Sequence, residues 1–397
     1  MKTTCFIRVP SFCTPISPII RKHLQKSFNK TGHYNQNHIS TLNSAQTSIS
    51  TSPSSPAPST SHKPQTPVFL RPLIYSSTFP DLQSFTSWAK TLVSSVGSTF
   101  VQLDNGSDST LLLRELRWLL EDSIDDPSLI PHLGICQNGG ITSNTGSSST
   151  EVVRLRVSLG QMYQLWKQRI QERRPFQYIV GCEHWRDLVL SVEEGVLIPR
   201  PETEKIVDLV GNVVGGNEML REGLWADLGT GSGALAIGIA RILGKNGRVI
   251  ATDLSPTAIS VAKFNVERYG LQDIIEIKQG SWFSPLVHVE GELDGLVCNP
   301  PYIPSEDIGS LQAEVAKHEP RLALDGGVEG MDNLLHLCER TAAMLKPGGF
   351  FAFETNGEKQ CRLLANHMEN EMTGSFRDVN IVSDFADIPR FLTGFCD

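Results

Sequence analysis

From Leu224 onward, apolar stretches of strand length alternate with stretches of helical period, and this alternation constrains the fold of the 397-residue chain most strongly. The predicted strands lie at 223–229, 247–253, 274–280, 293–299, 348–355 and 380–384. The predicted helices between them lie at 234–244, 256–270 and 330–345. Such an order implies a mostly parallel sheet that helices cover on both faces. We therefore expect an α/β domain of Rossmann-like type over residues 216–397.

Amphipathic patterns of helical period precede this domain. They repeat apolar residues at spacings of three and four, and they lie at 81–93, 109–123 and 154–170. In the second pattern Ser109 is placed to cap the helix, and in the third the apolar series begins at Leu155. We expect a small helical bundle domain over 80–180, which a Gly/Ser-rich insertion at about 134–150 interrupts.

A linker joins the two predicted domains over residues 181–215. The stretch "HWRDLVLSVEEGVLIP" alternates apolar and polar residues, which predicts a β-hairpin with its turn at Glu-Glu-Gly. The following stretch "RPETEKIVDLVGNVV" predicts a linker helix with Pro201 near its first turn.

Charge is distributed unevenly along the chain. No Asp or Glu precedes Asp81, whereas eight of the 35 Lys and Arg residues do. The remainder therefore holds 27 basic and 43 acidic residues, a net charge of −16. An acid-free, Ser/Thr-rich N-terminus with scattered basic residues is typical of an organelle transit peptide. We assign residues 1–70 to such a peptide without a folded core, with a plain disordered tail as the alternative. Its Ser and Pro content favours the chloroplast over the mitochondrion.

The composition also weighs against several classes of partner. The acidic remainder offers no broad electrostatic attraction for nucleic acid, and no apolar stretch is long enough to cross a bilayer. The eight cysteines are spread singly with no C-x-x-C pair, which argues against a structural metal site and a disulfide framework. We expect a monomer that contacts neither membrane nor nucleic acid directly, although the sequence leaves the oligomeric state open.

A glycine-rich turn follows the first predicted strand of the α/β domain. In "ADLGTGSGALAIG" the turn precedes a helix and consists of Gly229, Thr230, Gly231, Ser232 and Gly233. Glycines let the backbone approach a nucleotide closely, and ligands of such sheets bind at the carboxyl ends of the strands. The spacing loosely satisfies the dinucleotide fingerprint, which taken alone is a weak signal.

Acidic residues beside this turn favour one ligand. A carboxylate at Asp227 would repel a pyrophosphate, but it suits the cationic amino-acid tail of S-adenosylmethionine. The second strand ends at Asp253, whose side chain can accept hydrogen bonds from both ribose hydroxyls; the alternative is a helix cap. Trp282 follows the third strand and is a candidate to lie against adenine, with core packing as the alternative. We expect S-adenosylmethionine as the cofactor.

The fourth strand ends in the segment Asn299-Pro300-Pro301-Tyr302. Two prolines fix the backbone and lack N–H donors, so the carbonyls stay free to accept hydrogen bonds. The Asn299 side-chain oxygen and the Pro300 carbonyl can each accept one hydrogen of a planar NH₂ group, while Tyr302 packs against that group. Placement of the nitrogen and electrostatics would then drive methyl transfer. The segment predicts an amide or exocyclic amine as the acceptor.

These residues bring the chain to a recognisable family. It resembles the HemK/PrmC-type protein-(glutamine-N5) methyltransferases, which methylate the glutamine of the Gly-Gly-Gln motif in class I peptide chain release factors. The resemblance spans about residues 82–396. Its specific motifs are "RRPFQYIVGCEHW", "VLIPRPETE", "HEPRLALDGGVEGMD", "LKPGGFFAFETNGEKQ" and "SDFADIPRFLTGF".

The resemblance implies a helical domain that helps to hold the release factor, followed by the methyltransferase domain. It assigns cofactor contacts to Gly229–Gly233, Asp253, Trp282 and Asn299, and glutamine contacts to Asn299–Tyr302. The segment "ETNGEKQ" departs from the family's usual Glu-Ile-Gly, away from the predicted reactive centre. Within "HEPR", the alternatives are a salt-bridged loop and a flap over the substrate.

We therefore expect an organellar release factor glutamine methyltransferase with a class I release factor as partner. The runner-up is a methyltransferase acting on adenine-N6 or guanine-N2 of nucleic acid, which would require a basic groove or a target-recognition domain. A non-enzymatic assembly factor for organellar ribosomes is a third class, and the intact Asn-Pro-Pro-Tyr segment counts against it. A dehydrogenase has no place for Asp227 or that segment.

Overall fold

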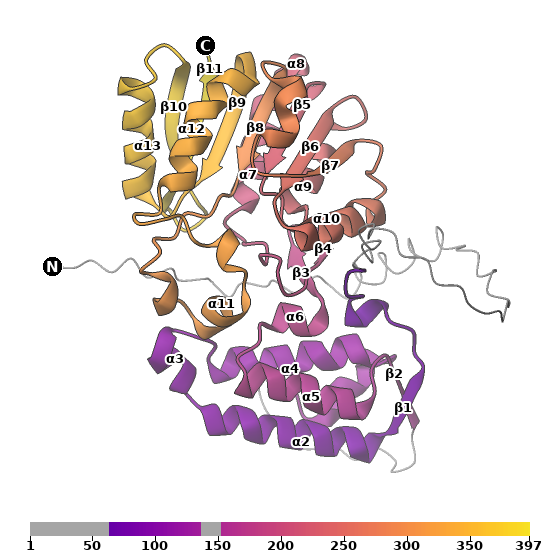
Figure 1. Cartoon of the computed structure of the whole chain (residues 1–397). Helices are drawn as coiled ribbons and strands as arrows, with labels where there is room; N and C mark the ends of the chain where they lie inside the picture. Colours follow the sequence, from indigo (N-terminus) through magenta and orange to yellow (C-terminus); the bar gives the residue numbers. More distant parts are fainter. Residues whose placement is uncertain (1–62, 136–151) are drawn as a thin grey trace, which may run out of the picture. The chain divides into compact units, whose positions relative to one another are not determined.

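The computed structural model describes residues 63–135 and 152–397 and contains a seven-stranded sheet, seen in the upper half of Figure 1. Strands β9, β8, β5, β6 and β7 run parallel, and near one edge β11 is antiparallel to both of its neighbours, β9 and β10. In sheet order the strands are β10 (Phe376–Ser383), β11 (Pro389–Cys396), β9 (Leu345–Glu354), β8 (Leu293–Cys298), β5 (Leu224–Leu228), β6 (Arg248–Asp253) and β7 (Ile275–Gln279).

The sheet confirms the predicted α/β fold and the six predicted strands. The seventh strand of the sheet, β11, was not among those predictions, although it lies inside the sheet between β9 and β10. The three predicted helices are confirmed as α9 (Ala234–Leu243), α10 (Pro256–Arg268) and α12 (Asp332–Met344). Helix α13 (Glu358–Asn370) was not predicted.

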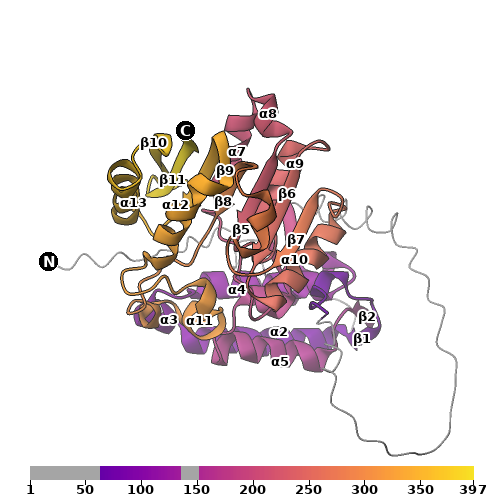
Figure 2. The same ribbon diagram turned by 45° about the horizontal axis from the view of Figure 1, so that its top comes forward.

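Helices cover both faces of the sheet, as Figure 2 shows. On one face, Trp225 and Val297 pack with α9 and with the linker helix α7 (Glu204–Val214), in a core that includes Ile206, Val210 and Ile237. On the other face, Leu296 and Cys298 pack with α12 and α13, through Leu334, Leu337 and Leu364. Neighbouring residues of one strand thus point to opposite faces, which explains why the central strands read as continuous apolar runs. A short helix, α8 (Glu218–Arg221), precedes β5.

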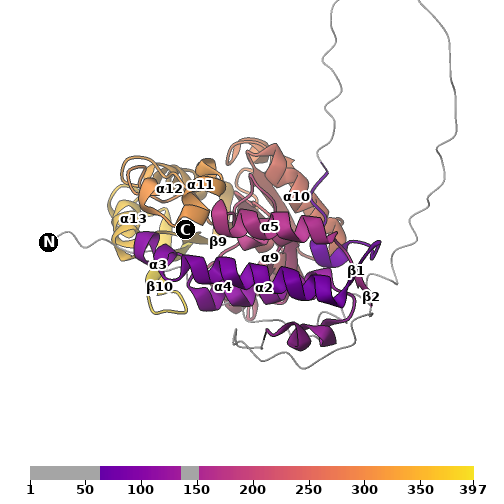
Figure 3. The ribbon, with the colours of Figure 1, turned by 90° about the horizontal axis from the view of Figure 1, so that it is seen from below.

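Helices α2 (Phe79–Val96), α4 (Ser109–Ser123) and α5 (Leu159–Gln171) lie side by side (Figure 3). Their apolar stripes face one another, and the indole Nε1 of Trp166 donates to the Ala89 carbonyl oxygen at 3.2 Å. Two shorter helices, α3 (Thr99–Asp104) and α6 (Phe176–Val180), and a 3-10 turn (Pro127–Leu133) complete this helical segment.

Two local predictions in this segment were wrong. Asp108, not Ser109, caps α4, and its Oδ1 accepts from the Leu111 N–H at 2.7 Å. The third helix begins only at Leu159, because Ser158 and Gln161 form a capping box there. Leu155 instead belongs to β2 (Val152–Leu155), which pairs with β1 (Tyr75–Thr78) in an antiparallel ladder.

The predicted hairpin is present, but its turn lies elsewhere. Strands β3 (Cys182–Trp185) and β4 (Leu188–Ser191) are joined by Arg186 and Asp187, with φ of 52° at Arg186. The expected Glu-Glu-Gly turn comes after β4, where the Val196 N–H donates to the Glu193 carbonyl. Two residues suffice for a hairpin turn when the first adopts positive φ, and the sequence carries no glycine to mark it.

Ordered structure also begins earlier than the predicted boundary at residue 70. A short 3-10 helix covers Val68–Leu70, Val68 is buried, and the Gln65 N–H donates to Glu193 Oε2 at 2.7 Å. The rest of the predicted transit peptide, up to residue 62, and the predicted insertion from residue 136 to 150 lie outside the described residues. Within the described part of the chain, no helix is long and apolar enough to span a membrane.

Candidate active site

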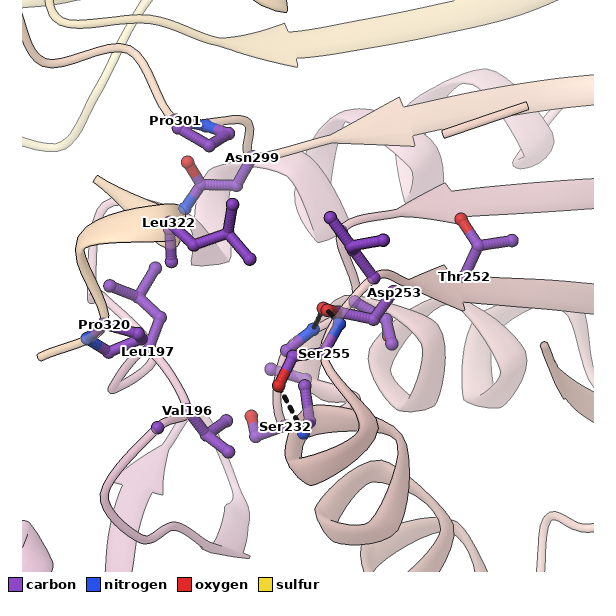
Figure 4. A pocket seen from close by; sticks show the side chains of 18 of the residues that line it. Val196, Leu197, Ser232, Thr252, Asp253, Ser255, Asn299, Pro301, Pro320 and Leu322 are labelled. Atoms are coloured by element: carbon purple, nitrogen blue, oxygen red, sulfur yellow. Dashed lines mark hydrogen bonds between the residues drawn. The ribbon is translucent and has the colours of Figure 1, made fainter. Parts of the chain in front are cut away.

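A cavity of about 640 Å³ lies at the carboxyl ends of the parallel strands (Figure 4). The loops that follow β5, β6, β7 and β8 contribute to its wall. In Figure 4, Asp253 and Ser232 lie on one side, and Asn299 and Pro301 lie across the open space from them. This is the position at which open α/β sheets bind their ligands, and the volume is in the range of cofactor sites.

The glycine-rich turn forms one wall of the cavity. Gly229, Gly231 and Gly233 have φ of 73°, 56° and 85°, a backbone region that side chains with a Cβ rarely adopt. The N–H groups of Gly229 and Thr230 donate to the Thr252 carbonyl, so the turn folds back onto β6. Gly229 to Ser232 line the cavity, as predicted, whereas Gly233 does not and is instead the N-cap of α9.

Asp227 lies beneath the turn and does not line the cavity. Its side chain is fully buried, and Oδ2 accepts from Thr230 Oγ1 at 2.6 Å and from the Ala236 N–H at 3.0 Å. Burial raises the pKa of Asp227 to about 7. The prediction of a direct contact with the cofactor tail is therefore corrected: the carboxylate shapes the turn from below. Sequence alone could not show this, because a strand-end residue can point to either side of the loop.

The residues at the ends of β6 and β7 line the cavity as predicted. Both oxygens of Asp253 accept backbone N–H groups, Oδ2 from Gly231 at 2.9 Å and Oδ1 from Ser255 at 2.8 Å. Ser255, not Asp253, caps α10, so the helix-cap alternative for Asp253 was wrong. Burial also raises the pKa of Asp253. Trp282 lines the cavity beside Gly229 and also packs on the core, so the core-packing alternative is confirmed and the contact with adenine stays a prediction.

A second, smaller hollow of about 150 Å³ adjoins the first. Pro300 and Tyr302 line the smaller hollow, Pro301 lines the larger cavity, and Asn299 lines both. The rigid segment after β8 is therefore a wall between two spaces. Charged side chains of both signs surround the smaller hollow: Asp104, Arg200, Glu202, Glu354 and Arg390.

Hydrogen bonds extend from this wall into the protein. Asn299 Nδ2 donates to Thr203 Oγ1 at 3.0 Å, and Thr203 Oγ1 donates to Glu354 Oε2 at 2.7 Å. The Tyr302 hydroxyl donates to Glu354 Oε1 at 3.0 Å. Gln360 Nε2 donates to the Tyr302 carbonyl at 2.9 Å. The segment that begins at Glu354 thus touches the predicted reactive centre, contrary to the expectation from sequence.

Residues 303–331, here called the flap, cover the site. From the flap, Pro320, Arg321 and Leu322 line the larger cavity. Glu319 accepts from Arg200 Nη2 at 2.7 Å and from the Ile198 N–H at 3.2 Å, which fixes the flap to the linker. The salt-bridged alternative for "HEPR" is therefore confirmed. The neighbours of Glu319 face the larger cavity, and their role as a flap over the substrate stays a prediction. The flap contains α11 (Ala313–His318) and two 3-10 turns (Ile308–Ser310, Arg321–Ala323).

The flap is also bonded to the helical segment. Asp104 Oδ2 accepts from the Ala313 N–H at 2.9 Å, and Gln312 Nε2 donates to the Asn105 carbonyl at 2.7 Å. His318 Nε2 lies 2.9 Å from the carbonyl oxygen of Glu172, the C-cap of α5. Asp104 and Asn105 also line the smaller hollow, so the helical segment contributes directly to the wall of this hollow.

Comparison with known proteins identifies relatives along most of the described chain. The family model described as ribosomal protein L11 methyltransferase (PrmA) matches residues 216–319. A release factor glutamine methyltransferase of Thermosynechococcus vestitus is 40% identical over 240 residues, covering 60% of this chain and 80% of that protein. One of Synechocystis sp. is 41% identical over 229 residues, covering 57% and 75%. One of Gloeobacter violaceus is 39% identical over 259 residues, covering 62% and 86%.

The sheet, the glycine-rich turn and the cavity, together with these matches, define an S-adenosylmethionine-dependent methyltransferase. The residues present fit that cofactor. The glycine-rich turn lets the backbone approach a ligand closely, the Asp253 carboxylate stands at the end of β6, and the Trp282 indole lies beside the cavity. At this identity and coverage, the chain belongs to the release factor glutamine methyltransferase family.

Proposed function

We propose that the chain methylates the side-chain amide nitrogen of the glutamine in the Gly-Gly-Gln motif of organellar class I peptide chain release factors. The observation that carries the proposal is the place of Asn299 in the wall between two cavities. The larger space suits the cofactor and the smaller one a single extended side chain. The names of the relatives support the release factor as the protein that supplies this side chain.

S-adenosylmethionine, when bound in the larger cavity, supplies a methyl group made electrophilic by its sulfonium. Gly229 to Ser232 would contact the amino-acid moiety of the cofactor. Asp253 would accept hydrogen bonds from its ribose hydroxyls, and Trp282 would lie against its adenine. The place of these residues in the wall of the larger cavity supports the assignments. Asp227 acts only indirectly, by holding the turn through Thr230 and Ala236.

The protein's role in catalysis is to orient the acceptor nitrogen. An amide nitrogen is a poor nucleophile because its lone pair is delocalised into the carbonyl. The Asn299 Oδ1 and Pro300 carbonyl oxygens accept its two hydrogens, and Tyr302 packs against the planar group. The nitrogen gains the methyl carbon as the carbon–sulfur bond breaks, the electron pair stays on sulfur, and one N–H proton leaves to water. Placement and electrostatics supply the rate, with no strong base required beforehand.

Mass spectrometry tests the proposal directly. The purified full chain is mixed with S-adenosylmethionine and a chloroplast-type release factor, and the Gly-Gly-Gln peptide is analysed. We expect a gain of one CH₂ unit on that peptide, absent from a release factor with Gln→Ala in the motif. If methylation appears instead on added RNA or DNA, the acceptor is a nucleic-acid amine. No gain on chloroplast or mitochondrial factors, with cofactor binding intact, overturns the proposal.

We also propose the chloroplast as the site of action, with the mitochondrion as the alternative. The acid-free, Ser/Pro-rich N-terminal stretch supports an organelle address. The three relatives described above are cyanobacterial, which agrees with a plastid origin. A fluorescent protein fused behind residues 1–70 should accumulate in chloroplasts of plant cells. Accumulation in the cytosol would contradict the proposal.

A further inference from the structure

The orientation of the Asn299 amide decides whether it can serve the acceptor. A carboxamide presents an acceptor oxygen at one end and two N–H donors at the other. Only the oxygen can receive a hydrogen of the substrate NH₂ group. If the carboxamide of Asn299 rotated by half a turn, its NH₂ group would face the NH₂ group of the substrate, and the two sets of donors would repel each other.

Thr203 sets this orientation through the single proton of its hydroxyl. Thr203 Oγ1 lies 3.0 Å from Asn299 Nδ2 and 2.7 Å from Glu354 Oε2. A hydroxyl has one hydrogen to donate and two lone pairs that accept. When that hydrogen goes to Glu354, the oxygen can only accept from Asn299, which must then turn its NH₂ group towards Thr203. The Asn299 oxygen Oδ1 accepts no hydrogen bond from any described residue, so it remains for a ligand.

Glu354 fixes the direction of the hydrogen bonds that run from Asn299 to Thr203 and from Thr203 to Glu354. It ends β9, its side chain is 1% exposed, and its second oxygen accepts from the Tyr302 hydroxyl at 3.0 Å. An ionised carboxylate is an acceptor only, so both neighbours must donate to it. One carboxylate therefore holds both side chains of the acceptor wall, Tyr302 directly and Asn299 through Thr203.

We propose that Thr203 and Glu354 are positioning residues that hold the Asn299 carbonyl oxygen towards the substrate amide, and that protonation of Glu354 releases it. The inference rests on the proposed function. A protonated Glu354 can donate to Thr203, Thr203 can then donate to Asn299 Oδ1, and the amide turns its NH₂ group outward. Methyl transfer thereby depends on the charge of Glu354, which borders the smaller hollow and acts on the acceptor amide through Thr203 and Asn299.

The surroundings of Glu354 place this change in a useful pH range. Burial raises its pKa to about 7, against the opposing hydrogen bond from Thr203 and the charge of Arg390. Arg390 is itself paired with Asp384 at 3.0 Å. Glu202, from the residues before α7, adds a repulsive negative charge, and the neighbouring Cys298 thiol stays protonated because burial raises its pKa. Glu354 is thus ionised above about pH 7 and protonated below it.

Two substitutions at one position test the positioning role. Thr203→Val keeps the shape and removes the hydroxyl, and Thr203→Ser keeps the hydroxyl. We expect kcat of Thr203→Val to fall by about 10- to 100-fold with a smaller change in KM for the release factor. Thr203→Ser should retain activity within a few-fold of the wild type. Wild-type kcat in Thr203→Val overturns the inference, as does an equal loss in both variants.

The pH profile tests the role of Glu354. Single-turnover rates at saturating substrates should fall as pH drops through about 7 in the wild type. Gln at position 354 cannot ionise, so this fall in rate, the acidic limb of the pH profile, should be absent from Glu354→Gln between pH 6 and 8. A limb that persists unchanged in Glu354→Gln overturns the inference. Unfolding midpoints measured at each pH show whether a change in the pH dependence of the rate comes from loss of the folded structure.

A measurement without substrate keeps the inference separate from the proposed function. The side-chain NH₂ signals of Asn299, assigned by their loss in Asn299→Asp, report its hydrogen bond in amide NMR spectra of the full chain. We expect them to shift with a midpoint near pH 7, and the shift to vanish in Thr203→Val. Signals that ignore both changes overturn the inference. If the wild type shows this titration but methylates no release factor, only the proposed substrate is contradicted.

Discussion

Arg169 in α5 and Glu314 in α11 form a buried ion pair, with 2.9 Å between Nη1 and Oε1, across 145 residues of sequence. Arg169 also holds Glu115 through Nε at 2.6 Å, and Arg173 holds both oxygens of Glu314. The pair fastens the flap to the helical segment. The helices that precede the methyltransferase fold therefore help to position the loop that closes its active site.

Removal of Glu314 should destabilise the protein strongly. Glu314→Ala leaves Arg169, which is 2% exposed at its side chain, with one buried carboxylate partner fewer. The loss of one member of such a buried pair costs about 3–5 kcal/mol. Urea denaturation measures the change. The matched control is Glu358→Ala, which breaks the exposed pair with Arg362 and should change stability by less than about 0.5 kcal/mol. Equal effects of the two substitutions would contradict a stabilising role for the buried network.

Substitution of Asn299 should separate binding from catalysis. Asn299→Ala removes one of the two proposed acceptors for the substrate NH₂ group, while the cavity walls beside it remain. We expect a folded protein that binds S-adenosylmethionine with modest loss and transfers methyl about 10²–10³-fold more slowly. Calorimetry measures the binding, and mass spectrometry of the release factor peptide measures the rate. Asn370→Ala, on the exposed face of α13, serves as the control. Wild-type turnover in Asn299→Ala would refute the amide clamp.

Asp227 should make stability depend on pH in an unusual direction. Its pKa in the folded protein is about 7, above the ordinary value near 3.9 that applies when unfolded. Ionisation is therefore disfavoured in the folded state, and stability falls as pH rises from about 4 to about 7. Asp227→Asn cannot ionise, so this fall, on the order of 3–4 kcal/mol, should be missing from its profile. Unfolding free energies at pH 5 and pH 8 decide the matter: an unchanged difference between the two pH values would exclude Asp227 as the source.

Gly295 in β8 should tolerate no side chain. A Cβ at this position would lie 2.2 Å from Cε3 of Trp225, which is fully buried. We expect Gly295→Ala to cost about 1–3 kcal/mol, since the core must shift to admit the methyl group. Gly309→Ala is the control, because a Cβ there meets no atom within 4 Å. Differential scanning calorimetry should show a lower Tm for Gly295→Ala alone. Identical Tm values would mean that the indole moves freely.

The sheet was predictable because its signals are local. Alternating apolar runs and helical patterns from Leu224 onward gave the strands in their correct places, and the glycine turn and Asn299 stood at strand ends. Local signals were weaker where structure depends on partners far away. Leu155 continues a helical pattern, yet pairing with Tyr75 makes it part of a strand. Strand β11 carries polar and glycine residues that mask its place inside the sheet.

The site was predictable in part for the same reason. Residues that follow one strand, such as Gly229 and Asn299, carry their own motif. Thr203 and Glu354 lie 151 residues apart in two separate motifs, "VLIPRPETE" and "LKPGGFFAFETNGEKQ", and only the fold brings their side chains to 2.7 Å. The depth of Asp227 beneath the turn is likewise a property of packing. A local signal for Glu354 was its place as an acidic residue at the end of an otherwise apolar strand.

The order of strands in the sheet has a consequence for synthesis. Strand β10 leaves the ribosome before β11, yet β11 lies between it and β9, and β10 pairs with no other strand of the described sheet. Until β11 has been translated, β10 has no edge to join, and β9 exposes an unpaired edge of its own. Unpaired strand edges are prone to mispairing. A nascent chain halted before Pro389 would carry the unpaired edge of β9 and an unpaired β10, so β11 is the strand that joins β10 to the rest of the sheet.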